Sequence, residues 1–280
     1  MAASEPGSED QQLGAVNRRR LLSLAGGLGV SAMIDACSHA PAQDSASAHA
    51  NDPSKPPAPN GGAPTPIGTT PSSEAPTFVP PAPRPAAAQL LCRDSWGARP
   101  ALPGGRPNPI TRATVHHSAT VLGANSNAPS RFRQDQLYHQ DQLGWIDIAY
   151  HVGIDHGGNI YELRKPEIAG DTATEYDPIG HFLVLCEGNF DQEPVSEPLF
   201  NSLALVCAWA AQRYNFPPDM VAAHRDFAQT ACPGANLYAR MTSGELRRQV
   251  KFLLENGGVD LLLLCGAEGL ARVAAIEAGN

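Results

Sequence analysis

The sequence predicts an α/β fold in which a central mixed sheet is flanked by helices. Short apolar runs that are typical of strands alternate with segments whose apolar residues repeat at helical spacing. Hydrophobic residues make up 42% of the chain, which is enough for one sizeable core. Half of the 26 prolines, however, lie in residues 41–88. Because proline fixes φ and removes an amide donor, that block cannot be helix or sheet throughout, and the foldable part is shorter than the whole chain.

Residues 1–36 have the pattern of an export signal. Three arginines at 18–20 precede 14 uncharged residues at 21–34. That run is shorter than the roughly 20 residues that span a bilayer, and a basic stretch before a short apolar run is typical of a secretory signal. The arginine pair beside Leu21 and Leu22 resembles a twin-arginine signal. We therefore expect an exported protein of the cell envelope, periplasmic or extracellular.

Residues 37–88 are predicted to be a disordered linker. They are rich in Pro, Ala and Ser and lack the apolar residues needed to offset the entropy of ordering, while the prolines stiffen the chain. Cys37, which follows Ile34, Asp35 and Ala36, resembles a lipoprotein processing site. Two alternatives stay open: membrane anchoring through a lipidated Cys37, or simple cleavage after a small residue nearby.

From Gln89 onward the composition is that of a globular domain, and strands dominate its first half. Trp96 is available to pack at the edge of this domain. A helix is expected at 130–143, where Ser130 can cap it and Gly144 can end it. Strand patterns occur at 113–118, at 148–155, and from the turn signal at 156–159 through Leu163.

The second half alternates strands and helices. Buried-type strands are expected at 181–186 and 221–223, and a helix at 243–255. We expect the C-terminal tail, residues 256–280, to form a helix that packs on the domain or on a partner, because its charges argue against a membrane span. Between the two strands, one helical face carries Leu199, Leu203, Val206, Cys207 and Ala210.

Three short stretches carry residues suited to binding a metal. Side chains alternate across a strand, so His116 and His117 point to opposite faces and at most one of them can readily serve a given site. His224 follows the strand predicted at 221–223, and Cys232 lies eight residues further on. Imidazole nitrogen and thiolate sulfur are good zinc ligands, and a catalytic zinc takes three protein ligands plus water. From spacing alone, structural roles for these residues remain open.

Eight stretches between residues 93 and 250 form a joint pattern. They are 95–100 (SWGARP), 115–119 (VHHSA), 149–154 (AYHVGI), 159–162 (NIYE), 179–180 (IG), 187–190 (EGNF), 223–226 (AHRD) and 230–234 (TACPG). In their order and spacing they resemble the zinc amidase family that includes peptidoglycan recognition proteins and phage N-acetylmuramoyl-L-alanine amidases. The resemblance implies a single amidase domain at 89–255.

The resemblance also implies an active site. The zinc (Zn2+) ligands would be His116, His224 and Cys232, and Tyr150 matches the family's active-site tyrosine. Thr230 stands where the family has a lysine or threonine that helps to polarise the substrate. The implied reaction is hydrolysis of the amide between N-acetylmuramic acid and L-alanine in peptidoglycan, for cell-wall remodelling or lysis. Family members that only bind the wall tend to lack the cysteine, so the presence of Cys232 favours an enzyme.

Some residues leave alternatives open. Asp171 stands where many family members have a histidine, which affects substrate recognition. His181 would either occupy nearby space or fill the core. Glu187 would be a carboxylate that handles protons or supports the site, or a structural residue at a strand end.

Two other function classes compete with the enzyme. One is a peptidoglycan-binding module without hydrolysis, and the other is a structural zinc domain, whose metal is normally closed by four protein ligands. We expect a monomer, and the net charge of −8 argues against a nucleic-acid partner. Three disulfide pairings are possible among the four remaining cysteines, which are Cys92, Cys186, Cys207 and Cys265. Cys186, on a buried strand, and Cys207, on a core helix face, could equally be free.

Overall fold

The structure, a computed structural model, describes residues 84–280. The predicted export signal, Cys37 and most of the predicted linker lie outside these described residues. In chain order the elements are β1 (Ala86–Leu91), β2 (Arg112–His117), α1 (Ala128–Asp141), β3 (Val152–Ile154), β4 (Ile160–Glu162), β5 (His181–Cys186), α2 (Glu197–Tyr214), β6 (Val221–Ala223), α3 (Ala235–Thr242), α4 (Glu245–Glu255), β7 (Val259–Leu264) and α5 (Gly266–Glu277). Short 3-10 turns lie at Asn125–Asn127, Pro218–Met220 and His224–Asp226. Within the described range, no helix combines the length and apolar character that a membrane crossing requires.

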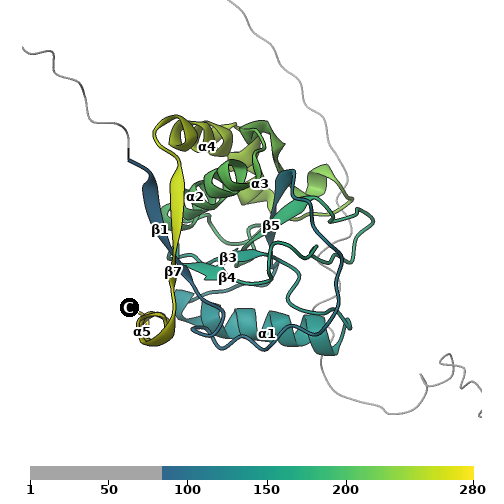
Figure 1. The fold of residues 1–280 in the computed structure, drawn as a ribbon, viewed down its shortest axis with the longest axis vertical. Coiled ribbons are helices and arrows are strands. Elements are labelled where there is room, and N and C mark those ends of the chain that lie inside the picture. Colours follow the sequence, from purple (N-terminus) through teal and green to yellow (C-terminus); the bar gives the residue numbers. More distant parts are fainter. Residues whose placement is uncertain (1–83) are drawn as a thin grey trace, which may run out of the picture. The chain divides into compact units, whose positions relative to one another are not determined.

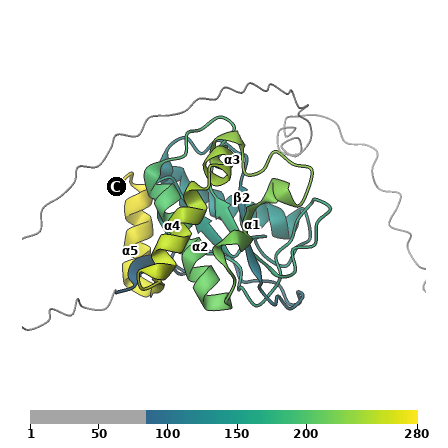
Figure 2. The ribbon, with the colours of Figure 1, turned by 90° about the horizontal axis from the view of Figure 1, so that it is seen from above.

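One seven-stranded sheet organises the domain, in the order β6-β2-β5-β3-β4-β1-β7. Only β3 and β4 pair antiparallel, and the other neighbours are parallel, so the predicted mixed sheet is confirmed. Helices α1 and α5 lie on one side of the sheet and α2 and α4 on the other (Figure 1). Seen from above, α2 and α4 lie side by side (Figure 2).

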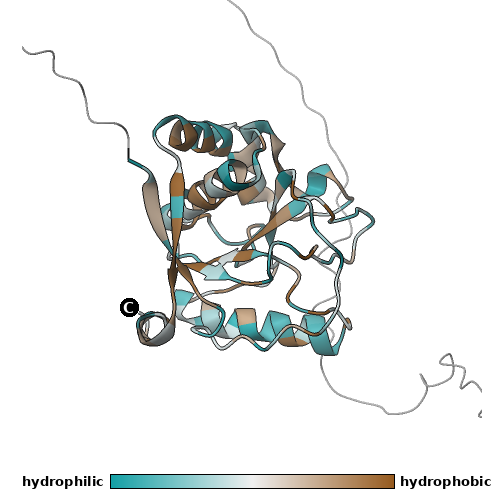
Figure 3. Cartoon of the chain, viewed as in Figure 1, coloured by the Kyte–Doolittle hydropathy of each residue, from teal (hydrophilic) through white to brown (hydrophobic). Residues whose placement is uncertain are grey.

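Apolar side chains form a core on each face of the sheet. The larger core joins α2 and α4 to the strands, and the smaller one includes Trp96, Phe132 of α1 and Val273 of α5. Figure 3 shows hydrophobic colour along β5 and mostly hydrophilic colour along α1. The buried face of α1 is therefore partly polar: the Gln136 side chain donates to Arg99 O at 2.9 Å and to Asp147 Oδ1 at 2.7 Å.

Most predicted strands are present. One of them is shorter than predicted, because side chains and not a neighbouring strand bond its first backbone groups. Strands β2, β5 and β6 lie where the sequence predicts them, and α1 begins at Ala128, before the predicted Ser130 cap. The predicted strand at 148–155 is shortened to β3. Its missing first half is held by side chains instead, because Ile148 O accepts from Arg164 Nε at 2.8 Å and Ala149 N donates to His139 Nδ1 at 3.2 Å.

The C-terminal segment corrects the prediction of a purely helical tail at 256–280. The structure has strand β7 there, followed by α5, and β7 pairs in parallel with β1 along its whole length. Strand β1 itself begins at Ala86, inside the linker predicted at 37–88. The domain therefore extends from β1 to α5, beyond the predicted limits of 89–255. The reason is that each of these strands is specified by a partner far away in the sequence, which a local pattern does not reveal.

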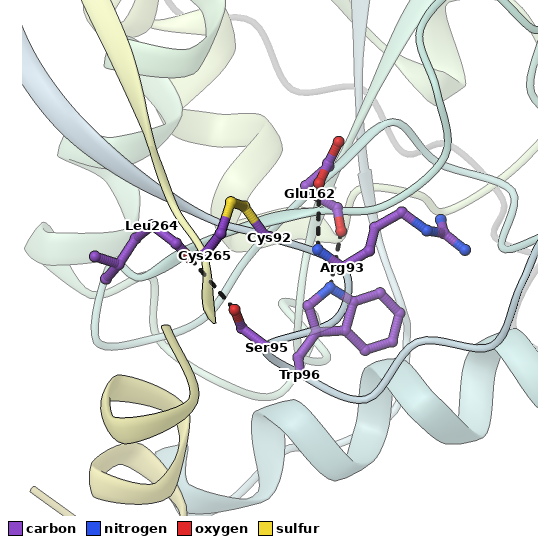
Figure 4. Close-up of a disulfide and its surroundings, with 7 residues drawn as sticks. All are labelled: Cys92, Arg93, Ser95, Trp96, Glu162, Leu264 and Cys265. Carbon is purple, nitrogen blue, oxygen red and sulfur yellow. Dashed lines mark hydrogen bonds between the residues drawn. A yellow bond between two sulfur atoms is a disulfide. The ribbon is translucent and has the colours of Figure 1, made fainter. Parts of the chain in front are cut away.

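A disulfide between Cys92 and Cys265 joins the ends of β1 and β7 (Figure 4). Beside it, Ser95 Oγ donates to Leu264 O at 3.3 Å, and the Trp96 indole donates to Glu162 O at 2.8 Å. Of the cysteines open to pairing, Cys186 and Cys207 are buried free thiols in the larger core.

Candidate metal centre

The three predicted metal ligands converge from separate parts of the chain. His116 lies near the end of β2, and His224 directly follows β6. Because β2 and β6 are parallel neighbours, with Val115 opposite Ala223, the two histidines leave the sheet at the same edge. Cys232 comes from the loop before α3. One potential ligand atom from each residue lies within 4.8 Å of the others, and all three residues are buried.

Local hydrogen bonds set the position of the cysteine. The Sγ atom of Cys232 accepts from the backbone N–H of His117 at 3.3 Å and lies 3.7 Å from Nδ1 of His116. The backbone N–H of Cys232 donates to Thr230 Oγ1 at 3.1 Å, and its carbonyl accepts from Arg225 N at 3.0 Å. The loop therefore turns the sulfur inward, toward the imidazoles.

The chemistry of the donor set fits zinc. Two imidazole nitrogens and one thiolate sulfur are the donors that this borderline-soft ion prefers. Burial lowers the pKa of His116 well below its ordinary value and that of His224 to about 4. Both rings are therefore neutral near pH 7, and a histidine must be neutral to bind a metal.

Two tyrosines border the cluster. The ring of Tyr150 is half-buried, and its centroid lies 5.2 Å from that of His116. The hydroxyl of Tyr176 lies 3.3 Å from Nε2 of the same histidine. Burial raises the pKa of Tyr176, with a further contribution from nearby Cys232, so this phenol stays neutral. Sequence reasoning singled out Tyr150 but missed Tyr176.

A second residue that the sequence did not reveal contacts the other imidazole. Thr174 Oγ1 lies 2.8 Å from Nε2 of His224. Thr174 and Tyr176 belong to the same segment between β4 and β5, which has no regular secondary structure. The one signal nearby was Asp171, which departs from the family pattern and here forms an ion pair with Arg164 at 2.6 Å.

Glu187 lies apart from the three ligands. It is fully buried at the end of β5, where Oε1 accepts from Ser118 Oγ at 2.8 Å and lies 3.9 Å from Arg131 Nε. Burial raises the pKa of Glu187 well above its ordinary value, and nearby Asp135 adds to the shift. Its other carboxylate oxygen, Oε2, is buried and has no hydrogen-bond partner among the described residues. Both alternatives that the sequence left open for Glu187 therefore remain predictions.

The other histidines near the site have packing roles. His117 faces away from the cluster, as the strand alternation predicts, and its Nδ1 accepts from Phe190 N at 3.3 Å. His151 accepts from Leu183 N at 2.8 Å and stacks on Phe182. His181 has features of both predicted alternatives, core filling and proximity to the site. It is buried, with Nδ1 2.7 Å from Thr114 Oγ1, and its ring centroid lies 5.2 Å from that of Tyr176.

Comparison with known proteins identifies the family. The profile described as N-acetylmuramoyl-L-alanine amidase matches residues 106–235. Peptidoglycan-recognition protein LB of Drosophila melanogaster is 30% identical over 161 residues, which cover 56% of this chain and 69% of the relative. The chain belongs to the amidase and peptidoglycan recognition protein family. Another member, peptidoglycan recognition protein 1 of Mus musculus, is 29% identical over 57% of this chain and 90% of its own length.

Solved structures of the family share the fold. Drosophila peptidoglycan recognition protein SD superposes with a TM-score of 0.51 at 23% identity, covering 55% of this chain and 92% of that one. Peptidoglycan recognition protein LE, solved in complex with tracheal cytotoxin, gives a TM-score of 0.50 at 25% identity, covering 55% and 92%. The family includes both amidases and recognition proteins, so the choice between hydrolysis and recognition rests on the site.

Proposed function

We propose that this family member is a zinc-dependent N-acetylmuramoyl-L-alanine amidase that acts on peptidoglycan. The observation that carries the proposal is the buried cluster of His116, His224 and Cys232. Over residues 84–280, the cluster includes no fourth His, Cys, Asp or Glu. A structural zinc is normally closed by four protein ligands, whereas three ligands leave a position for water or substrate. The donor count therefore supports a catalytic site over a structural one.

The substrate class follows from the family. A relative of the same fold, recognition protein LE, was solved in complex with monomeric diaminopimelic acid-type peptidoglycan. We infer that the present chain takes muramyl peptides at the same kind of surface, with the metal cluster at the scissile amide. When bound, zinc supplies Lewis-acid polarisation of a carbonyl and lowers the pKa of water.

The chain's own hydroxyl groups would complete the site. Tyr150 borders His116, and Thr230 is bonded to the backbone of Cys232, so both come from segments next to ligands. We propose that they hydrogen-bond the attacking water, or donate to the carbonyl oxygen as it gains charge, where donors act most strongly. The full burial of Glu187 against Ser118 supports a role in ordering the β5 end, and Tyr150 is then the better candidate to relay a proton to the leaving amine.

Recognition without hydrolysis is the second candidate. The observation that favours it is Asp171, which is engaged with Arg164 where many family members have a histidine. On this alternative the protein binds peptidoglycan and releases no new amino termini. The two candidates therefore differ in one product that can be measured directly.

The deciding experiment measures zinc content and amino-terminus release on the same preparations. Purified protein is incubated with peptidoglycan, with and without a chelator. Cys232→Ala removes a proposed ligand, and Cys207→Ala is the matched control because it removes a buried thiol that lies outside the proposed site. We expect near-stoichiometric zinc and release in the wild type and in Cys207→Ala, and loss of both in Cys232→Ala. Cosedimentation with peptidoglycan without any release would reject the enzyme.

We also propose that the protein works outside the cytoplasm, in the cell envelope, as a monomer. The Cys92–Cys265 disulfide supports an oxidising compartment, in agreement with the predicted twin-arginine-like signal. Intact mass of the mature protein separates the two predicted fates of Cys37: a lipid-sized increment indicates a membrane anchor, and a chain that starts beyond Cys37 indicates cleavage. Sedimentation velocity of the mature protein tests the monomer, which a dimer-sized species would contradict.

A further inference from the structure

One segment between β4 and β5 reaches both histidines of the metal cluster. Thr174 Oγ1 lies 2.8 Å from Nε2 of His224, and Tyr176 OH lies 3.3 Å from Nε2 of His116. In His116 the other nitrogen, Nδ1, faces Cys232 Sγ at 3.7 Å. The two hydroxyl groups therefore contact the same nitrogen, Nε2, in each of the two imidazoles.

We propose that Thr174 and Tyr176 are positioning residues that hold the two histidines in the tautomer and orientation needed to bind the metal. This inference rests on the proposed zinc site. An imidazole that binds a metal through one nitrogen donates its remaining N–H to an acceptor, which fixes the ring and its tautomer. Thr174 and Tyr176 would accept from Nε2–H, which leaves Nδ1 of each ring to the metal.

The hydroxyl of Thr174 is itself part of a chain of hydrogen bonds. Its Oγ1 lies 2.8 Å from Oγ1 of Thr172, which also accepts from the backbone N–H of Thr174 at 3.1 Å. If Thr174 Oγ1 accepts from His224, its own O–H donates to Thr172, so the Thr174 hydroxyl has both a donor and an acceptor role. This arrangement fixes the threonine side chain before any metal binds.

Aromatic packing fixes the tyrosine in a similar way. The ring of Tyr176 lies 5.1 Å from that of His224, 5.2 Å from His181 and 6.0 Å from Phe227, by centroids. A ring held on several sides loses little further freedom when its hydroxyl contacts His116. The contact is therefore built into the apo fold.

Asp171 anchors the segment that carries both residues. Its carboxylate pairs at 2.6 Å with Arg164, whose side chain is 2% exposed. The same guanidinium donates to the carbonyls of Asp147 and Ile148, so it is fixed to the body of the domain. Asp171, which departs from the family pattern, thus helps to hold the segment that contacts the proposed metal ligands.

The test is zinc affinity, measured by competition with a chromogenic chelator on the purified protein. Loss of such an outer partner typically weakens metal binding by about 10–100-fold. We expect that loss in Thr174→Val and, because its hydrogen bond is longer, a loss toward the lower end in Tyr176→Phe. Thr174→Ser keeps the hydroxyl and should retain affinity.

Thr242→Val and Tyr138→Phe are the matched controls, since they make the same chemical changes in α3 and on the exposed face of α1. Their zinc affinity should equal that of the wild type. Substituted Co2+ gives a second readout, because its visible absorption reports ligand geometry and should change in Thr174→Val but not in Thr242→Val. Unchanged affinity and spectrum in both Thr174→Val and Tyr176→Phe overturn this inference alone, whereas a wild type that binds no zinc overturns the proposed function.

Discussion

The Cys92–Cys265 disulfide gives the sharpest prediction for stability. The bond closes a loop with a sequence separation of 173 residues, between strands at one edge of the sheet. In the chain-entropy model, a loop of that length stabilises the folded state by about 5 kcal/mol, at the upper end of what disulfides contribute. Replacing both cysteines by alanine should therefore lower the free energy of unfolding by up to about 5 kcal/mol.

The assay is denaturant unfolding of the metal-free protein, followed by circular dichroism. Cys207→Ala serves as the control for loss of a thiol outside any disulfide. The metal cluster lies on β2 and β6, at the opposite end of the strand order from β1 and β7. Under native conditions, the double variant should therefore keep its zinc. A loss below about 1 kcal/mol would refute the reasoning, because it would mean that the bond adds little constraint to the unfolded chain.

Four further predictions address the site and its surroundings. Tyr150→Phe should retain zinc but lower kcat for amide hydrolysis by about 10²–10³-fold if its hydroxyl stabilises the oxyanion, and an unchanged kcat would remove that role. Asp171→Ala should cost about 1.5–3 kcal/mol in urea unfolding because it leaves the buried Arg164 without its carboxylate, and Asp171→Asn, which keeps an acceptor, should cost less. Burial lowers the pKa of His139 and His151 to about 4, so the unfolded chain binds more protons than the folded one between about pH 4 and 6.5. The contribution of these two histidines to the stability of the metal-free protein should therefore fall as pH falls through that window. Burial raises the pKa of Asp135 to about 7, so this carboxyl stabilises the fold as pH falls, in the opposite direction to the histidines. Asp135→Asn should therefore make the free energy of unfolding, measured in urea, fall more steeply from pH 7 to pH 4.5. A less steep fall than in the wild type would contradict the raised pKa of Asp135.

The parts of the fold that local patterns specify were predictable. Strand β5 is buried along its whole length and is continuously apolar after His181, and helix α2 buries the apolar residues whose helical spacing predicted it. Strand β7 was not predictable in the same way. Its leucines at 262 and 263 are exposed, because it lies at the edge of the sheet, and only its pairing with β1 defines it as a strand. The sequence left the disulfide pairing open for the same reason, since the pairing depends on that strand pair.

Local sequence motifs made the candidate metal ligands predictable, but no such motif marks Thr174 and Tyr176, which contact them. His116 and His224 each lie at the end of a short apolar strand, so a local motif marks each one, and parallel pairing of β2 and β6 brings them together. Thr174 and Tyr176 lie in a segment without regular secondary structure. The position of that segment depends on Arg164, whose partners are spread over residues 147–171.

This difference explains how Asp171 can depart from the family pattern without disturbing the cluster. A ligand must present one donor atom to the metal, so its identity is tightly restricted. A supporting segment only needs to place an acceptor near the second nitrogen of each imidazole, and different side chains can do this. In this chain the buried guanidinium of Arg164 requires an anion, and Asp171 supplies it while fixing the segment that carries Thr174 and Tyr176. Asp171, which favoured recognition without hydrolysis, is therefore compatible with the proposed metal site.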